Sequence, residues 1–88
     1  MNNEHTFMTF PCDFKLKIIG NNTESFVLDI NVIARRHFPD LKDGAIHSQL
    51  SQQGNYLAIS IDLHVQNQLT LDALYIELTQ HPEIKMVL

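Results

Sequence analysis

The chain has 88 residues, 44% of them hydrophobic, and a formal net charge of −4. This length fits one domain, and the apolar content excludes a chain that is disordered throughout. Its single cysteine, Cys12, excludes an intramolecular disulfide. The negative net charge argues against a protein whose main function is to bind the phosphate backbone of nucleic acids. The chain carries neither a secretion signal nor an apolar run of about 20 residues, so we expect a soluble, cytoplasmic protein without membrane contact.

The first 38 residues predict a leader, a strand and a helix. We expect residues 1–9 to form a loosely ordered polar leader and residues 10–88 a single domain. Over residues 13–19 the alternation predicts a strand with Phe14, Leu16 and Ile18 on the core face. Asn21, followed three residues later by Glu24, resembles a capping box and predicts a helix start at this point. The helix should run from about residue 23 to residue 37 or 38, because Pro39 disfavours helical geometry before it.

The remainder predicts three strands and a second helix. We expect a strand at residues 45–51, a hairpin turn at 52–55 and a strand at 57–65 whose odd-numbered apolar residues face the core. A second helix is predicted over residues 68–80, ended by Pro82. The last strand is expected to place Ile84, Met86 and Leu88 on one face, with Lys85 and Val87 opposite.

The order of these elements is βαββαβ. With right-handed crossovers it predicts an α+β, ferredoxin-like sandwich with a four-stranded antiparallel sheet of order 4-1-3-2 and two helices on one face. The two strands with the clearest alternation then occupy the centre of the sheet. A chain of this size buries a modest core, and a partner subunit would add to its stability.

Several short motifs resemble the YbeD-like family of small bacterial proteins of unassigned function. They are Phe10-Pro11-x-x-Phe14, Lys17-x-x-Gly20, Ser51-x-x-Gly54-Asn55-Tyr56, Leu74-Tyr75-x-x-Leu78 and Met86-Val87-Leu88. The resemblance implies a ferredoxin-like fold close to the ACT regulatory domains, implies no catalytic residue, and hints at lipoate metabolism. Two positions depart from the family: Gln53 replaces a usual Lys, and Ile76 replaces a frequent acidic residue.

Candidate chemical groups are sparse. The five histidines lack the spacing of a zinc site, and Cys12 has no basic neighbour in the sequence that would activate a thiol. Asp62 and His64 share a strand face and form either an acid–base pair or part of a solvated surface. On the same predicted face, Lys15, Lys17 and Lys85 form either a basic stripe or a solvated surface. The open sheet face lacks the stacking aromatics of an RNA-recognition sheet, so we expect no nucleic-acid partner.

Two candidate binding surfaces remain. Gly20, Asn21 and Asn22 are predicted to form a small-ligand site for a carboxylate metabolite, because free N–H groups at a helix start attract anions. Leu28, Val32, Leu69 and Ile76 are predicted to point outward from the helices and to form an interaction patch for a weak homodimer or a protein partner.

The sequence therefore predicts a non-catalytic regulatory or adaptor domain that binds a small metabolite or a protein, with a link to lipoate metabolism. The alternative is a pure protein-interaction or homodimerisation module without a small-molecule ligand. We expect no enzymatic activity, no cofactor and no metal. A small enzyme using the open sheet face is the weakest of the three classes considered.

Overall fold

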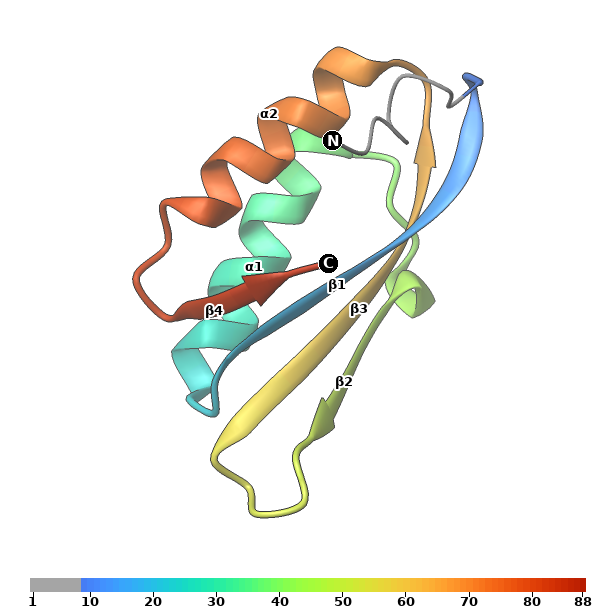
Figure 1. Ribbon diagram of the computed structural model, residues 1–88. Helices are drawn as coiled ribbons and strands as arrows, with labels where there is room; N and C mark the ends of the chain where they lie inside the picture. Colours follow the sequence, from blue (N-terminus) through green and yellow to red (C-terminus); the bar gives the residue numbers. More distant parts are fainter. Residues whose placement is uncertain (1–8) are drawn as a thin grey trace.

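The computed structural model describes residues 9–88, which form one sheet with two helices on the same side (Figure 1). Apart from Thr9, the predicted leader lies outside the described residues. The predicted βαββαβ order is confirmed. In chain order the elements are β1 (Cys12–Asn21), α1 (Glu24–His37), the short 3-10 helix η2 (Asp43–Ala45), β2 (Ile46–Leu50), β3 (Tyr56–Val65), α2 (Gln68–Thr79) and β4 (Ile84–Val87).

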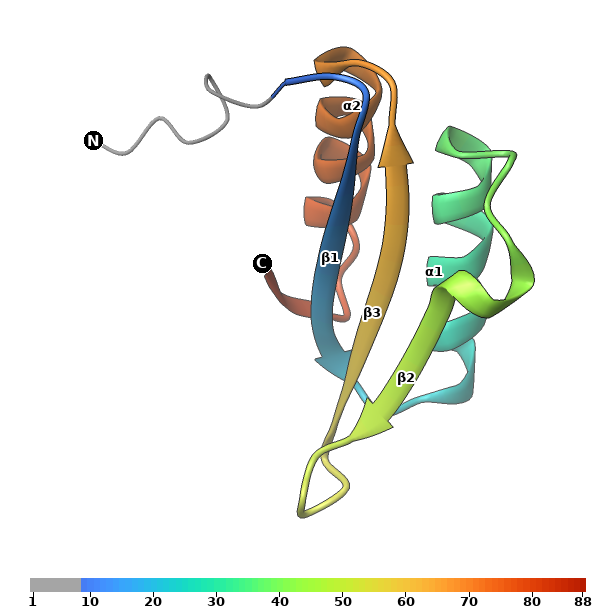
Figure 2. The ribbon, with the colours of Figure 1, turned by 90° about the vertical axis from the view of Figure 1, so that its right-hand side faces the viewer.

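The sheet has the order β2-β3-β1-β4, and all neighbouring strands are antiparallel. This confirms the expected ferredoxin-like topology. The two central strands pair along their full length, from Cys12 opposite Val65 to Asn21 opposite Tyr56. Both helices lie behind the sheet in the view of Figure 2, so no helix or strand of residues 9–88 covers the other face of the sheet. No helix among the described residues is long and apolar enough to span a membrane.

The core lies between the sheet and the helices. The alternating apolar residues of the two central strands and the inward stripes of both helices meet there, as their periodicity predicts. Burying each large side chain contributes about 1.5–3 kcal/mol, so these contacts set the position of each helix on the sheet. The largest fully buried side chains are Leu16, Ile18, Phe26, Ile30, Ile59, Ile61, Leu63, Val65, Leu71, Leu74 and Leu78.

The start of α1 differs from the prediction. The N-cap residue is Thr23, whose hydroxyl accepts a hydrogen bond from the backbone N–H of Phe26 at 3.2 Å. Asn21, the predicted cap, belongs to β1 instead. The predicted capping box is therefore wrong, because β1 continues for two residues beyond its last predicted position. At the other end, α1 stops at His37, and Pro39 follows the cap residue Phe38 as expected.

The face of β4 is also different from the prediction. Val87 pairs with Ile18 and Met86 with Ile19, but Gly20 pairs with Ile84, so the register shifts at Lys85. A bulge of this kind places two residues opposite one and interrupts the alternation. Ile84 and Val87 therefore both pack against the core, whereas Met86 and Leu88 are exposed.

The two central strands run past their shorter neighbours at one end of the sheet (Figure 1). Strand β2 pairs with β3 only over residues 57–61, and the pairing of β4 with β1 covers only residues 18–20. At the projecting end, residues 12–15 and 62–65 pair with each other alone. In the described part of the chain, no strand lies beside residues 62–65 on the outer edge of β3.

Candidate functional site

The three residues predicted as a ligand turn lie at the junction of β1 and α1. Gly20 and Asn21 are the last residues of β1, and Asn22 follows them. Gly20 is buried, and a Cβ placed on it would lie 2.3 Å from Cζ of Phe26 and 2.7 Å from the carbonyl oxygen of Glu83. The absence of a side chain at Gly20 thus allows the close approach of an aromatic ring and a backbone segment. This packing requirement accounts for the glycine without any ligand.

The backbone N–H groups of this junction already have partners. Asn21 donates to the carbonyl of Glu83 at 3.1 Å, and Asn22 donates to the carbonyl of Asn55 at 3.4 Å. The Thr23 hydroxyl lies 3.1 Å from a carboxylate oxygen of Glu83. An acidic side chain of the protein itself therefore lies at the start of α1, where an anionic ligand was predicted. The ligand site stays a prediction, and this geometry does not favour it.

The four residues of the predicted interaction patch are all exposed. The exposed fractions are 62% for Leu28, 57% for Val32, 81% for Leu69 and 59% for Ile76. Their outward direction agrees with the predicted helix phase. The ion pairs His81–Asp29 and Arg36–Glu77 connect α1 with α2 and with the loop after α2. Polar groups therefore lie between the two helices, and binding through the four apolar residues stays a prediction.

Each described histidine contacts a carboxylate from another part of the fold. These contacts join elements that are distant in sequence, which is a structural use of histidine that its spacing in the sequence does not reveal. The Asp62–His64 contact considered from the sequence is not among them, because each residue has a different partner. The pairs are His37–Glu77 at 2.7 Å, His47–Asp62 at 3.7 Å, His64–Asp13 at 2.9 Å and His81–Asp29 at 3.0 Å.

Glu77 is the centre of one of these contacts, between the two helices. The hydrogen bond from His37 and the contact with Arg36 together hold the pKa of the Glu77 carboxyl below its usual range, against the opposite effect of partial burial. Both partners favour the ionised carboxylate. This cluster therefore links the C-terminal half of α1 to α2 as a structural feature.

His81, Asp29 and Glu83 form a cluster whose side chains are close enough to be considered as metal ligands. The Nδ1 atom of His81 accepts the backbone N–H of Glu83 at 3.1 Å, so the ring proton lies on Nε2, which donates to Asp29. A metal at Nε2 would need the proton on Nδ1, where the N–H of Glu83 already points. The ring also makes an edge contact with Phe26, with centroids 5.8 Å apart. These contacts favour a structural histidine over a metal ligand.

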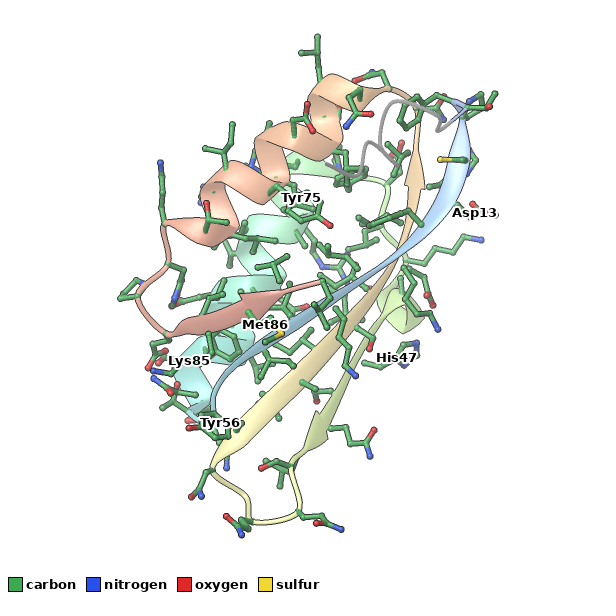
Figure 3. The ribbon with its side chains drawn as sticks, in the orientation of Figure 1. Asp13, His47, Tyr56, Tyr75, Lys85 and Met86 are labelled. Atoms are coloured by element: carbon green, nitrogen blue, oxygen red, sulfur yellow. The ribbon has the colours of Figure 1, made fainter. Side chains whose placement is uncertain are left out.

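The basic stripe considered on the open face is interrupted. Lys15 lies 3.6 Å from Asp62, and the same carboxylate is 3.7 Å from His47, so charges of both signs share this surface. Figure 3 shows Asp13 and His47 on the side of the sheet away from the helices. Both residues of the His64–Asp13 pair are well exposed, so water competes for them and the pair is weak. This mixed surface matches a solvated sheet face.

A cavity of about 650 Å³ lies where the central strands project past β2, and we call it the end pocket. Its walls are mostly apolar, with polar groups of the β3–α2 junction at the rim. It is formed by the C-terminal end of α1, the loop before β2, the end of β3 and the start of α2. The lining residues are His37, Phe38, Pro39, Asp40, Leu41, Lys42, Gly44, Ala45, Asp62, His64, Gln66, Asn67 and Thr70.

Each element that forms the end pocket has a local reason for its position. Pro39 follows the end of α1 and directs the chain away from the helix axis. The loop returns through η2, and Arg35 holds it by donating to the carbonyl of Leu41 at 2.8 Å. Across the pocket, Asn67 caps α2 by accepting the N–H of Thr70 at 2.9 Å. The walls are thus held by caps and by the core beneath them.

The end pocket was not predicted from the sequence. Its residues come from two segments about 20 positions apart, and none belongs to a recognised motif. The available signal was the difference in length between the second and third predicted strands, since the shorter strand leaves part of the longer one uncovered.

The comparisons with known proteins identify a family and carry no functional assignment. Residues 5–88 match the family model described as "Protein of unknown function (DUF493)". A UPF0250 protein of Chromobacterium violaceum is 38% identical over 79 residues, which cover 90% of this chain and 89% of that protein. A UPF0250 protein of Nitrosomonas europaea is 31% identical over 85 residues, covering 97% and 98% of the two chains. The resemblance to the YbeD-like proteins is thereby confirmed, and the chain belongs to the uncharacterised DUF493 (UPF0250, YbeD-like) family.

Proposed function

We propose that this protein is a non-catalytic binding domain that acts through the end pocket, in a regulatory or adaptor role. The observation that carries the proposal is the cavity itself. Its volume of about 650 Å³ lies within the range of ligand sites, and its walls combine apolar side chains with a few polar groups. The core and the helix caps hold these walls, so a ligand would meet a largely preformed site.

The proposed absence of catalysis is supported by the state of the polar groups near the pocket. His37 is hydrogen-bonded to Glu77, and His64 is paired with Asp13. Each pair leaves one ring nitrogen of the histidine free, but among the described residues neither ring is hydrogen-bonded to a Ser, Thr or Cys side chain, and a nucleophile needs a base beside it. Cys12, the one thiol of the chain, is not among the residues that line the pocket.

The charged side chains that line the end pocket indicate which charge a ligand should carry. Asp40 and Asp62 line the pocket, with Lys42 as the one lysine or arginine among its lining residues. This balance favours a neutral or positively charged ligand over the carboxylate metabolite expected from the sequence. The link to lipoate metabolism rests on the family resemblance alone, and lipoic acid is therefore included as an anionic probe.

A second candidate function is association through the helix layer. It is supported by the exposure of Leu28, Val32, Leu69 and Ile76, which is high for large apolar side chains in a folded protein. In that case the protein would bind a second copy or a partner without using the end pocket.

The test is a ligand screen with amide chemical shifts as the readout. The probes are a fragment set of neutral, cationic and anionic compounds that includes lipoic acid. We expect shifts at Leu41, His64 and Thr70, and we expect Gly44→Phe to abolish them, because the backbone at Gly44 lines the pocket with open space around it. The unfolding transition of Gly44→Phe should match that of the wild type, which shows that the substitution leaves the fold intact. Binding that is unaffected by this substitution, or an absence of binding by every probe class and by peptides, contradicts the proposal.

A further inference from the structure

We propose that the end pocket receives an extended peptide segment of a partner protein, which adds as a short strand to the outer edge of β3 and inserts an apolar side chain into the pocket. This inference rests on the proposed function and specifies its ligand. The partner segment is expected to carry Lys or Arg beside its apolar residue.

The edge of β3 carries the hydrogen-bonding groups that such a strand requires. On the side of β2, the carbonyl of Tyr56 accepts the N–H of Ser51 at 2.9 Å. In an antiparallel sheet the direction of the backbone groups repeats every second residue, and the pairing of β3 with β1 has no register shift. The N–H and C=O of His64 therefore point to the same edge. Among the described residues, neither group has a backbone partner there.

The end pocket lies directly along this free edge. Its lining includes Asp62 and His64 from β3, and Phe38, Leu41 and Ala45 from the opposite wall. A strand paired with residues 62–65 would span about 13 Å at 3.3 Å per residue, with alternate side chains directed toward opposite faces of the sheet. One of these directions leads toward the helix side, where Phe38 and Leu41 supply the apolar wall. Backbone pairing would give affinity, and this side chain would give specificity.

Charge complementarity selects the residues that flank the apolar side chain. Asp40 at the rim has no ion-pair partner among the described residues, and Asp62 adds a second carboxylate beside the free edge. Lys42 is the one lysine or arginine of the lining, and the whole chain has a net charge of −4. A basic peptide is therefore attracted to this edge, whereas an acidic peptide is repelled.

The experiment is a selection of displayed random dodecapeptides on the full-length protein, followed by synthesis of the enriched peptide. We expect enriched sequences with an apolar residue next to Lys or Arg. Replacing each peptide N–H in turn by N-methyl should weaken binding at least tenfold at alternate positions and little at those between, because only one edge of an added strand bonds to β3. The amide signal of His64 should shift, and its exchange with solvent should slow.

Two protein variants complete the experiment. Asp40→Lys should weaken binding of the basic peptide about tenfold, whereas the matched charge change Asp72→Lys, at an exposed position of α2 outside the pocket lining, should not. Uniform tolerance of N-methylation, or peptide-induced shifts at Leu28 and Ile76 instead of His64, would overturn the peptide proposal. If fragments bind in the pocket and no peptide is enriched, this inference fails while the proposed function stands. If neither binds, both fail.

Discussion

The substitution Gly20→Ala tests why a glycine occupies the end of β1. The added Cβ would lie 2.3 Å from Cζ of Phe26 and 2.7 Å from the carbonyl oxygen of Glu83, against ordinary contacts of 3.4–4 Å. The ring must therefore retreat by more than 1 Å, but Phe26 is fully buried against the core. Its neighbours leave no free volume for this movement, because protein interiors are close-packed.

The expected magnitude follows from two opposing effects. Overpacking of a core by one carbon destabilises by about 1–3 kcal/mol. Replacing glycine by alanine restricts the unfolded chain and returns about 0.4–1 kcal/mol. We therefore expect the free energy of unfolding to fall by about 1–2 kcal/mol, and the melting temperature of a domain of this size to fall by about 4–16 °C.

Urea denaturation measures this change, and Gly44→Ala is the matched control. A Cβ at Gly44 meets no atom within 4 Å and the backbone there is not left-handed, so by the same unfolded-chain effect Gly44→Ala should raise the free energy of unfolding by about 0.4–1 kcal/mol. Phe26→Leu shortens the side chain that meets the new Cβ, and its effect should be non-additive with that of Gly20→Ala. Equal stability of the two alanine variants, or strict additivity in the double mutant, would refute the packing explanation.

Three further predictions concern single contacts. Thr23→Ala should lower the free energy of unfolding, measured in urea, by about 1 kcal/mol, because it removes the acceptor of the Phe26 N–H. Thr23→Ser keeps the hydroxyl and should retain most of the stability. Equal losses in the two variants would show that the hydroxyl is not the cap. Glu77→Gln should destabilise the protein at neutral pH, and the difference from the wild type should disappear as the pH falls below about 4, because a carboxyl whose pKa is lowered in the folded state stabilises only while ionised. A pH-independent difference in thermal unfolding would contradict that reasoning. Ile76→Glu should leave the fold intact, since Ile76 is exposed, and should weaken any concentration-dependent association seen by sedimentation; a loss of more than about 2 kcal/mol in stability would instead identify a core position.

The fold was predictable because its signals are periodic. Both helices and the two central strands carry apolar residues at the spacing of their structure, and Pro39 and Pro82 mark the helix ends. Such patterns depend on many residues at once, so an error at one position does not change the predicted element. The right-handed crossover rule then leaves one order for the sheet.

The details that failed depend on single backbone positions. Asn21 and Thr23 are both acceptable cap residues, and only the length of β1 decides between them. Because of the bulge at Lys85, Met86 and Val87 lie on the faces opposite to those predicted, and no residue type in β4 is typical of a bulge. The packing role of Gly20 was also missed, because its close approach to Phe26, six positions later, and to Glu83 in the turn before β4 is tertiary information.

The candidate site was the least predictable part. The exposure of the helix patch followed from helix phase, since phase is a local property. The end pocket arises where the loop before β2 and the β3–α2 junction meet, which requires the relative lengths of β2 and β3 to be known within a residue or two. The charge balance at its rim likewise depends on which aspartates the fold brings together.

A single titration followed by the amide shifts of the whole chain tests the central claim most directly. The titrant is the tightest peptide or fragment obtained from the two screens, added to the full-length protein. If the end pocket is the binding site, the largest shifts should fall on residues 38–45 and 62–70, on both sides of the cavity. Shifts centred on residues 20–25 would instead support the junction of β1 and α1, and shifts centred on Leu28, Val32, Leu69 and Ile76 would support the helix patch; either result would contradict the assignment of the end pocket as the binding site.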